Sequence, residues 1–327
     1  MDGFAGKLAA VTGGGSGMGR ELVRQLAAQG CSVAACDWNA SAVADTVALA
    51  QAGAPDGVRV SGHACDVSDE AQVQQFRDEL LREHAADHVD LVFSNAGIGG
   101  GASFITSSRD EWERTFAVDW WGTYYCARTF LPLLIASGDG VLVNTSSVNG
   151  FWASLGPRMP NSAYATAKFA VKGFTEALIE DLRMNAPEVR VAVVMPGHVG
   201  TDIIANSRRA LGLPDPGLMS DEQIEELIPA TARGRLARNG LLAADASPDD
   251  LRQLLTRIET DFREKAPLSP AQAATIILDG VRSGTWRILV GRDAGLLDAA
   301  VRDKPEAAYD YPDLFGRIRA VVRDAPG

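Results

Sequence analysis

Short apolar runs alternate with longer amphipathic segments through the first two thirds of the chain. The runs are rich in valine and alanine, and they read KLAAVTG, CSVAACD, VRVSGHA, HVDLVFSNAG, GVLVNTSS and VRVAVVMPG. Runs that are apolar almost throughout predict strands that are buried on both faces, as in a parallel sheet covered by helices.

Apolar residues between these runs recur at helical spacing, and Ser68 and Ser108 stand where two of the helices are expected to begin. The helical segments are residues 17–30, 68–85, 109–136 and 163–185. Strands that alternate with helices predict an α/β fold, with a Rossmann-type, doubly wound parallel sheet and helices on both faces.

The pattern changes near the C-terminal end. Residues 203–266 are charged and carry several prolines, which predicts short helical pieces in an inserted cap. A capped helix over 269–284 and a strand in WRILVG follow, and a polar helical tail is expected over 293–327. We therefore expect residues 1–327 to form one Rossmann-type domain, with a helical cap insertion at about 203–266.

Composition and charge narrow the possible partners. The 327 residues are 46% hydrophobic, enough for a well-packed core, and the formal net charge is −11. A field of that sign repels phosphate backbones and anionic lipid, so neither nucleic acid nor a membrane surface is expected as a partner. The N-terminal stretch MDGFAGKLAAVTGGG has no long apolar run, so no signal peptide or membrane span is expected and the cytoplasm is the default compartment.

Metal and disulfide chemistry have little support. Four cysteines stand in apolar contexts without CxxC spacing and are expected to be buried, reduced thiols: Cys31, Cys36, Cys65 and Cys126. His84 and His88 are four residues apart, but no third ligand is evident, so they are interpreted as an exposed helix end.

A glycine-rich turn follows the first predicted strand and opens the first helix, in VTGGGSGMGRELV. Gly13, Gly17 and Gly19 let the backbone turn tightly and approach a pyrophosphate, while the helix N-terminus supplies free N–H groups. Asp37 ends the second strand, where a carboxylate accepts hydrogen bonds from ribose hydroxyls and repels a 2′-phosphate. No Lys or Arg stands at the nearby positions Ser16, Met18, Trp38 and Asn39. NAD is therefore favoured over NADP, which remains an alternative.

The turn has the spacing T-G-x3-G-x-G, and with it the chain resembles the short-chain dehydrogenase/reductase (SDR) family, in its compact single-domain branch. Asp66 in CDVSD matches the family's adenine contact, NAG follows the fourth strand, and PGHVGT matches the turn that holds the nicotinamide carboxamide. The resemblance is dense over 5–202 and implies a cofactor-binding set of Gly13, Ser16, Gly17, Met18, Gly19, Asp37, Asp66, Val67, Asn95, Ala96, Gly97, Tyr164, Lys168, Pro196, Gly197, Val199 and Thr201.

In YATAK, Tyr164 and Lys168 are four residues apart, which puts both on one face of a helix. The resemblance makes them the catalytic pair. Free tyrosine has a pKa of about 10, too high for an efficient base, but an adjacent ammonium and the positive nicotinamide ring favour the phenolate.

The stretch NTSSVNG offers two serines, and the family pattern selects Ser147 as the catalytic hydroxyl and leaves Ser146 a structural role. The segment that follows is longer than usual for the family, and we expect Trp152 and Met159 within it to form one wall of the substrate pocket. The cap would form the other wall. His198, in the nicotinamide turn, is a further candidate for the substrate side.

Asp119 occupies the family's fourth catalytic position, which is commonly an Asn in V-N-x-x-G and here reads VDWWG. In the family, the main-chain carbonyl of this residue holds a water that connects the lysine to solvent, and a carbonyl survives substitution. An ionised Asp119 would stabilise the Lys168 ammonium and raise the pKa of Tyr164, whereas a protonated one would resemble Asn.

The resulting prediction is an NAD-dependent oxidoreductase that transfers a hydride between nicotinamide and a bulky, largely apolar secondary alcohol or ketone. Two alternatives stay open: an NAD-binding SDR-like protein with little catalysis, acting as a scaffold or redox sensor, and an NADP-dependent ketone reductase. The resemblance also implies a homodimer or homotetramer built through the helices at 109–136 and 163–185.

Overall fold

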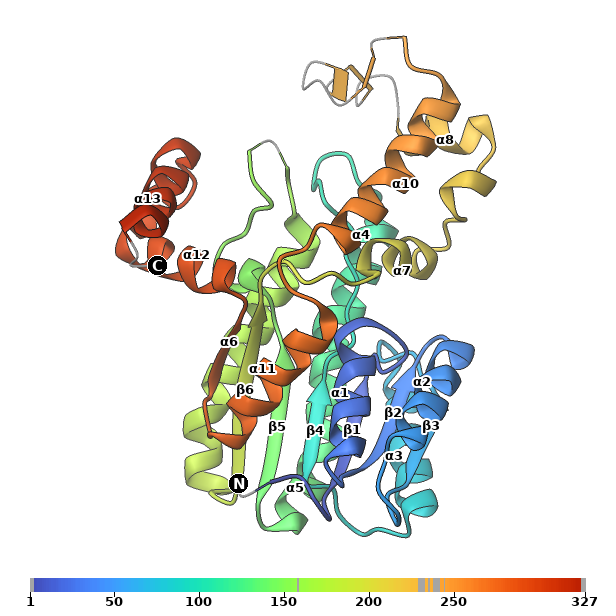
Figure 1. Ribbon diagram of the computed structural model, residues 1–327, viewed down its shortest axis with the longest axis vertical. Helices are drawn as coiled ribbons and strands as arrows, with labels where there is room; N and C mark the ends of the chain where they lie inside the picture. The colour runs from blue at the N-terminus through green and yellow to red at the C-terminus, as the bar shows by residue number, and fades with distance from the viewer. Residues whose placement is uncertain are drawn as a thin grey trace.

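The computed structural model describes residues 3–157, 159–228, 233–234, 236–237, 242–243 and 245–324, with side chains as far as residue 320. A seven-stranded parallel sheet has the strand order β3-β2-β1-β4-β5-β6-β7, which confirms the predicted doubly wound fold (Figure 1). Its strands are β1 (Leu8–Thr12), β2 (Ser32–Asp37), β3 (Val60–Ala64), β4 (Leu91–Ser94), β5 (Gly140–Thr145), β6 (Val189–Pro196) and β7 (Arg287–Val290).

The two faces of the sheet hold separate cores, because successive residues of a strand point to opposite sides. In β1, Ala9 and Val11 face one core, and Leu8 and Ala10 face the other. The first core is closed by α1 (Gly17–Ala28), α2 (Ala40–Ala52) and α11 (Pro270–Arg282). The second is closed by α3 (Glu70–His84), α5 (Gly122–Ser137) and α6 (Ser162–Asn185).

The helix predicted over 109–136 is continuous but changes its winding. It consists of α4 (Arg109–Phe116), the π-helical turn η1 (Ala117–Trp121) and α5. Ser108 caps α4 as predicted, since its hydroxyl accepts the Glu111 N–H at 3.1 Å. Helix α3 begins later than predicted, because Asp69 caps it and Ser68 instead hydrogen-bonds to Asp66.

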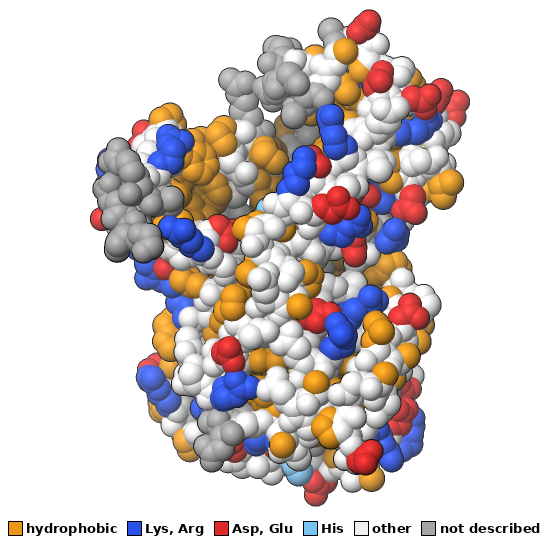
Figure 2. All heavy atoms as spheres, in the orientation of Figure 1, with side chains coloured by type: hydrophobic (Ala, Val, Ile, Leu, Met, Phe, Trp, Pro, Cys, Tyr) orange, Lys and Arg blue, Asp and Glu red, His pale blue; other side chains and the backbone are white. Residues whose placement is uncertain are grey.

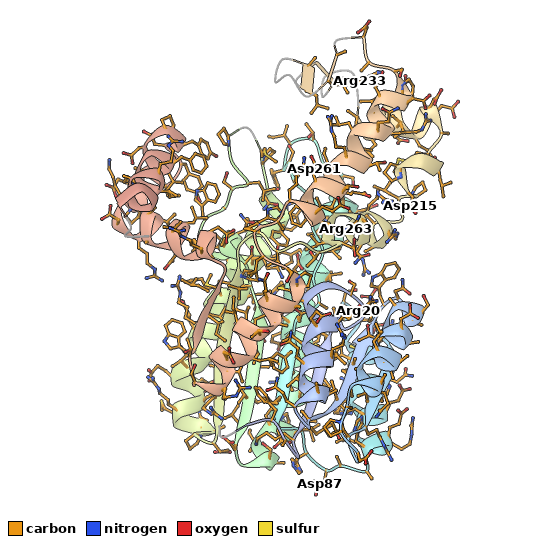
Figure 3. The ribbon with its side chains drawn as sticks, in the orientation of Figure 1. Arg20, Asp87, Asp215, Arg233, Asp261 and Arg263 are labelled. Atoms are coloured by element: carbon orange, nitrogen blue, oxygen red, sulfur yellow. The ribbon has the colours of Figure 1, made fainter. Side chains whose placement is uncertain are left out.

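The segment 203–266 contains helical pieces, as predicted, and rises beyond the carboxyl ends of the strands (Figure 1). These pieces are α7 (Ile203–Ala210), η3 (Pro216–Leu218), α8 (Asp221–Leu227) and α10 (Pro248–Glu264). Nearly buried Arg208 joins α7 to α10 through a 2.9 Å ion pair with Glu259. Arg263 pairs with Asp202 at 2.9 Å where α10 returns toward the sheet (Figure 3). Residues 229–232, 235, 238–241 and 244 of the predicted cap lie outside the described residues.

The C-terminal extension is α12 (Arg292–Asp303), η4 (Pro305–Ala307) and α13 (Tyr311–Asp324), across the strand ends from the cap (Figure 1). It is helical, as predicted, but not polar throughout. Leu314 is fully buried, and hydrophobic side chains gather on the side of the extension that faces the cap (Figure 2).

The four cysteines are free and buried, as predicted. His84 differs from its prediction: it is half-buried at the end of α3, and its Nε2 lies 2.9 Å from the Ser61 hydroxyl. Burial is the main cause that lowers the pKa of His84, to about 4. Within the described ranges, no three His, Cys, Asp or Glu side chains form a group suited to a metal ion. No helix in the described part of the chain is long and apolar enough to cross a membrane.

Candidate active site

The glycine-rich turn between β1 and α1 forms a tight cradle that side chains would fill. Gly13 and Gly17 have φ angles of 65° and 51°, a region that disfavours side-chain-bearing residues. A Cβ at Gly13 would lie 2.8 Å from the Ala96 Cα, and one at Gly19 would collide with the Gly13 carbonyl. The N-cap residue Ser16 makes no side-chain cap to α1, which leaves the first N–H groups of the helix without that partner.

Asp37 at the end of β2 reaches back to this turn. Its Oδ2 accepts the Gly15 N–H and its Oδ1 accepts the Asn39 N–H, both at 2.9 Å. Burial raises the pKa of Asp37, although these two donors and Arg20 act in the opposite direction. The Arg20 guanidinium donates to the Gly15 carbonyl at 2.6 Å and to Thr46 Oγ1 at 3.0 Å (Figure 3).

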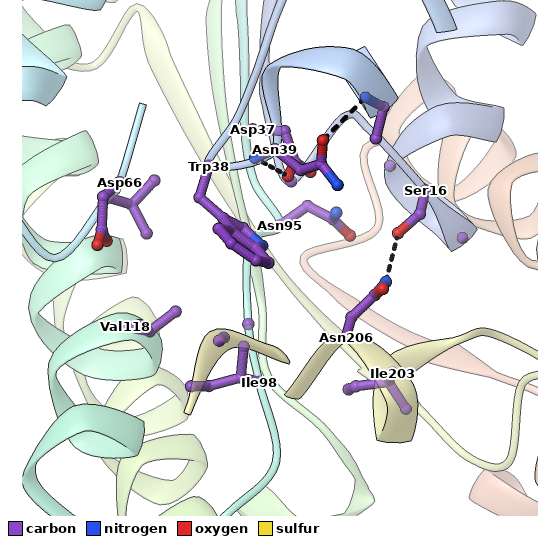
Figure 4. A pocket seen from close by; sticks show the side chains of 18 of the residues that line it. Ser16, Asp37, Trp38, Asn39, Asp66, Asn95, Ile98, Val118, Ile203 and Asn206 are labelled. Carbon is purple, nitrogen blue, oxygen red and sulfur yellow. Dashed lines mark hydrogen bonds between the residues drawn. The ribbon is translucent and has the colours of Figure 1, made fainter. Parts of the chain in front are cut away.

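A single pocket runs from this turn along the carboxyl ends of the strands (Figure 4). Twelve of the predicted cofactor residues line it: Gly13, Ser16, Gly17, Met18, Gly19, Asp37, Asp66, Val67, Asn95, Ala96, Gly97 and Thr201. Tyr164, Lys168, Pro196, Gly197 and Val199 do not line it. The pocket therefore corresponds to most of the predicted cofactor site and stops short of the predicted reaction centre.

Helix α7 closes part of this pocket, which the sequence did not indicate. Ile203, Asn206 and Ala210 line the pocket. Asn206 Nδ2 donates to Ser16 Oγ at 3.0 Å (Figure 4), and Ser207 Oγ accepts the Gly99 N–H at 2.7 Å. The start of the cap thus lies on the cofactor side as well as above the strand ends.

Two further side chains outside the sequence prediction organise the pocket walls. Thr12 Oγ1 accepts the N–H groups of Asn95 and Ala96 at 3.0 and 3.1 Å. Asn95 Oδ1 is buried and has no hydrogen-bond partner in the part of the chain that the structure describes. Arg114 of α4 pairs with Asp66 at 2.7 Å. Burial raises the pKa of Asp66, but the contacts with Arg114 and Ser68 outweigh it and leave the pKa below its usual value.

The predicted catalytic pair lies together, one turn apart on α6. Lys168 Nζ is 5.4 Å from the centre of the Tyr164 ring and donates to the Thr145 carbonyl at 3.2 Å. Asp119, in the π-helical turn, places Oδ1 at 3.3 Å from Lys168 Nζ and also accepts the Ile98 N–H at 3.1 Å. Asp119 is 0% exposed and Lys168 2%, so this ion pair is shielded from water.

The charges of this group act on each other. Burial raises the pKa of Asp119 to about 6, and the charge of Lys168 limits the rise. Burial alone would lower the pKa of Lys168, but the negative charges of Asp119 and of ionised Tyr164 outweigh it and raise that pKa. Burial also raises the pKa of Tyr164; Lys168 and the Ser147 hydroxyl oppose this rise, and Asp119 adds to it. Near neutral pH, Asp119 therefore carries a charge that works against phenolate formation.

The two adjacent serines have different partners. Ser146 Oγ donates to the Lys168 carbonyl at 2.7 Å, so this hydroxyl proton is used by the backbone of α6. Ser147 Oγ accepts the Asn149 N–H at 3.1 Å, and its own proton remains available to another acceptor. This difference favours Ser147 for the catalytic role.

The three predicted substrate residues are not brought together. Trp152 is buried, and its Nε1 donates to the Ala308 carbonyl at 2.7 Å in the C-terminal extension. His198 Nε2 lies 2.7 Å from the Phe262 carbonyl of α10, and the two rings are 4.4 Å apart. Met159 is 54% exposed. Trp152 and His198 thus have partners in the C-terminal extension and the cap, and Met159 lies at the surface.

Known proteins resemble this chain over most of its length. A family model described as short chain dehydrogenase matches residues 7–212. The putative oxidoreductase SadH of Mycobacterium tuberculosis is 33% identical over 302 residues, 92% of each chain. Meso-2,3-butanediol dehydrogenase of Serratia marcescens is 34% identical over 200 residues, 61% of this chain and 74% of that one. A short chain dehydrogenase/reductase from Burkholderia phymatum, solved in complex with NAD, superposes with a TM-score of 0.72 and 29% identity over 94% of this chain and 95% of the other.

Proposed function

Because this chain belongs to the short-chain dehydrogenase family, we propose that it transfers a hydride between NAD and a bulky, largely apolar secondary alcohol or ketone. Tyr164 is the general base in the oxidation and the general acid in the reduction. The observation that carries the proposal is the cluster of Tyr164, Lys168 and Ser147 beyond the reaction end of a pocket built for a dinucleotide.

The residues of the pocket fit a dinucleotide cofactor. The cradle at Gly13 and Gly19 has no room for a Cβ, so backbone can approach a pyrophosphate closely. Among the described residues, buried Asn95 Oδ1 has no hydrogen-bond partner, and it offers an acceptor to a bound group. We assign Thr201 of the pocket lining to the nicotinamide end, together with five residues beyond the lining: Pro196, Gly197, Val199, Tyr164 and Lys168.

NAD is the proposed cofactor, with NADP as the alternative. The Asp37 carboxylate lines the pocket and would repel a 2′-phosphate there. Arg20, the nearby cation, already donates to the Gly15 carbonyl and to Thr46, so its guanidinium is held within the turn. Both features support binding of an unphosphorylated ribose.

In the proposed mechanism the chain's own residues move one proton. The Tyr164 oxygen takes the hydroxyl proton of the alcohol, and the Lys168 ammonium beside its ring stabilises the phenolate. Ser147 donates its free hydroxyl proton to the substrate oxygen and stabilises the charge that develops on it. Bound nicotinamide supplies the hydride acceptor, and in the reverse direction Tyr164 returns the proton to the carbonyl oxygen.

Asp119 tunes this proton transfer from behind Lys168. Its carboxylate keeps Lys168 charged, and the same negative charge raises the pKa of Tyr164. We therefore propose that the enzyme is active with an alkaline-shifted optimum for alcohol oxidation. Asp119 is buried behind Lys168, so its effect on the reacting atoms passes through that side chain.

Exposed apolar side chains support an apolar substrate. Phe104 and Ile105 are 79% and 88% exposed on the loop after β4, and Leu155 and Met159 are 52% and 54% exposed on the loop before α6. The two loops are joined at their bases, where the Ser162 N–H donates to the Ala102 carbonyl at 2.8 Å. We assign Met159 to the entrance of the substrate site. Trp152 and His198 are weaker candidates for substrate contacts, because the polar groups of their side chains are already bonded to Ala308 and Phe262.

A second copy of the chain is the proposed protein partner. Trp121 and Phe169 are both 42% exposed, on the π-helical turn and on α6. Trp121 also lies within a cluster of aromatic rings, edge-on to Tyr124 and stacked on Tyr125. Exposed aromatic area of this kind is enriched at protein interfaces, which supports a homodimer or homotetramer formed through these helices.

The direct test follows NADH absorbance with a panel of apolar secondary alcohols, with NAD and NADP compared side by side. Turnover that Tyr164→Phe reduces by about 10²- to 10⁴-fold, the range expected for a lost acid–base group, supports the proposal. NAD binding without turnover of any panel member would instead favour a non-catalytic scaffold or sensor. Preference for NADP would support the alternative reductase.

A further inference from the structure

Two segments of the proposed active site make contacts with the C-terminal extension. One is the loop that begins at Ser147, two residues after the end of β5. The other is the PGHVGT turn after β6, residues 196–201. Both contact the C-terminal extension, residues 292–324, which lies wholly beyond the part of the chain that the family model matches.

The serine loop is bound to the extension through Trp152. Its Nε1 donates to the Ala308 carbonyl at 2.7 Å, and its ring packs edge-on against Tyr311 and Phe315. The next residue along, Ala153, donates its N–H to the Tyr309 hydroxyl at 3.1 Å. The contact therefore combines buried aromatic area with directional hydrogen bonds, and it fixes the backbone at 152–153.

Asn149 links the backbone at Trp152 to the proposed catalytic hydroxyl of Ser147. Its side-chain amide donates to the Trp152 carbonyl at 2.9 Å and to the Ser154 carbonyl at 2.6 Å. Its backbone N–H donates to Ser147 Oγ at 3.1 Å. Because Ser147 accepts this bond, its own proton is left free, and the direction of that proton depends on where Asn149 is held.

The nicotinamide turn is bound to the other end of the extension. Asp293, in the first turn of α12, accepts the His198 N–H on Oδ2 at 2.7 Å. A Cβ at Gly197 or at Gly291 would collide with the Asp293 carboxylate, so both glycines are needed for this approach. The His198 N–H of the turn is thus held from the side of the extension by one carboxylate acceptor.

We propose that the C-terminal extension is a positioning element of the active site: its contacts with Trp152 of the serine loop orient Ser147, and its Asp293 holds the nicotinamide turn. This inference rests on the proposed function for the roles of the two segments. The two contacts have different expected effects. Weakening the contact of Trp152 with the extension alters the chemical step, and weakening the contact of Asp293 with His198 alters cofactor binding.

The test uses point variants of the full chain. Trp152→Phe keeps the aromatic packing and removes the bond to the Ala308 carbonyl, with Trp286→Phe, at a 44% exposed tryptophan, as its matched control. Asp293→Ala removes the acceptor for the His198 N–H, and Asp293→Asn, which keeps an amide oxygen there, is its conservative partner.

Amide hydrogen exchange gives a readout that needs no activity. Trp152→Phe should speed exchange in peptides covering 145–154, and Asp293→Ala in peptides covering 196–201, with the rest of the sheet unchanged. Unchanged exchange in both segments, or a uniform increase throughout the protein, would overturn the proposal.

Steady-state kinetics then test the separation of roles. Trp152→Phe should lower kcat about tenfold at an unchanged KM for NAD, as expected for a slightly misplaced catalytic group. Asp293→Ala should raise the KM for NAD about tenfold, and Asp293→Asn should restore most of it. Equal changes in both constants in both variants would contradict the inference. A wild-type chain without turnover would refute the proposed function, and the exchange data would still decide the positioning role.

Discussion

The Asp119 carboxylate lies 3.3 Å from the Lys168 ammonium, and both side chains are buried. Two opposite charges without water interact strongly, so each fixes the charge of the other. The proposed base Tyr164 lies within reach of both, and its pKa reports their balance.

Asp119→Asn should move the pH–rate profile of alcohol oxidation to lower pH. The substitution removes the negative charge that raises the pKa of Tyr164 and leaves Lys168, whose ammonium lowers that pKa, in place. We expect the pKa of the low-pH limb of kcat/KM, below which the base is protonated, to fall by about one unit, the size of shift that a neighbouring charge produces. Asn also fits the volume of Asp, so packing is preserved. A low-pH limb at its original position would show that Asp119 has no electrostatic effect on Tyr164.

The two serines should respond differently to removal of the hydroxyl. Ser147→Ala should lower kcat by about 10²- to 10³-fold, because it removes the donor to the substrate oxygen. Ser146→Ala should mainly lower the free energy of unfolding, by about 1 kcal/mol, since its hydroxyl bonds to the Lys168 carbonyl. Urea denaturation and initial rates measure the two effects. The opposite pattern would assign catalysis to Ser146.

Asp37→Asn should weaken the discrimination against NADP. The charge that repels a 2′-phosphate is lost, while an amide oxygen can still accept the Gly15 N–H. We expect the ratio of kcat/KM for NAD over NADP to fall at least about tenfold, equivalent to about 1.4 kcal/mol. Asp37→Ala, which also loses the acceptor, is expected to weaken both cofactors. An unchanged ratio would mean that another group sets the preference.

Stability should decline in mild acid through His84. Its pKa is lowered to about 4 in the folded protein, so the unfolded chain, near 6.5, binds more protons between these two values. The contribution of neutral His84 to the free energy of unfolding is therefore fully present above about pH 6.5 and is lost as the pH drops toward 4. After allowance for partial exposure, the loss is on the order of 1 kcal/mol. His84→Gln should flatten the dependence of the urea midpoint on pH over this window. Equal slopes in both proteins would assign the acid sensitivity elsewhere.

Release of the reduced cofactor should depend on α7. Ser207→Ala removes the bond to the Gly99 N–H, and Ser283→Ala, at an exposed serine of α11's end, serves as the control. The first change should speed NADH dissociation about fivefold, the effect of losing roughly 1 kcal/mol of hydrogen bonding. Stopped-flow displacement of NADH fluorescence measures the rate. Identical rates for the two variants would show that α7 does not restrain the cofactor.

The sheet and its glycine turn could be predicted because their signals are local. Each strand is a continuous apolar run, and Gly13, Gly17 and Gly19 stand within a few residues of the strand they follow. The catalytic spacing of Tyr164 and Lys168 is likewise contained within one helical turn.

The side chains that complete the site could not be predicted, because their contacts depend on how distant segments pack. Arg114 meets Asp66 across 48 positions, and Asp293 meets His198 across 95. Trp152 was predicted from the sequence, but its role was not. An aromatic residue in that loop is equally consistent with a pocket wall or with a buried anchor, and only the course of the C-terminal extension distinguishes them.

Two hydrogen bonds, from Asn206 to Ser16 and from Gly99 to Ser207, hold α7 against the pocket. A nucleotide bound beneath α7 has a residence time set by how often this helix moves away, whatever the rate of the chemical step. Cofactor affinity and turnover then oppose each other: a contact that holds α7 more tightly over the pocket also slows release of the spent nucleotide, which must leave before the next turnover.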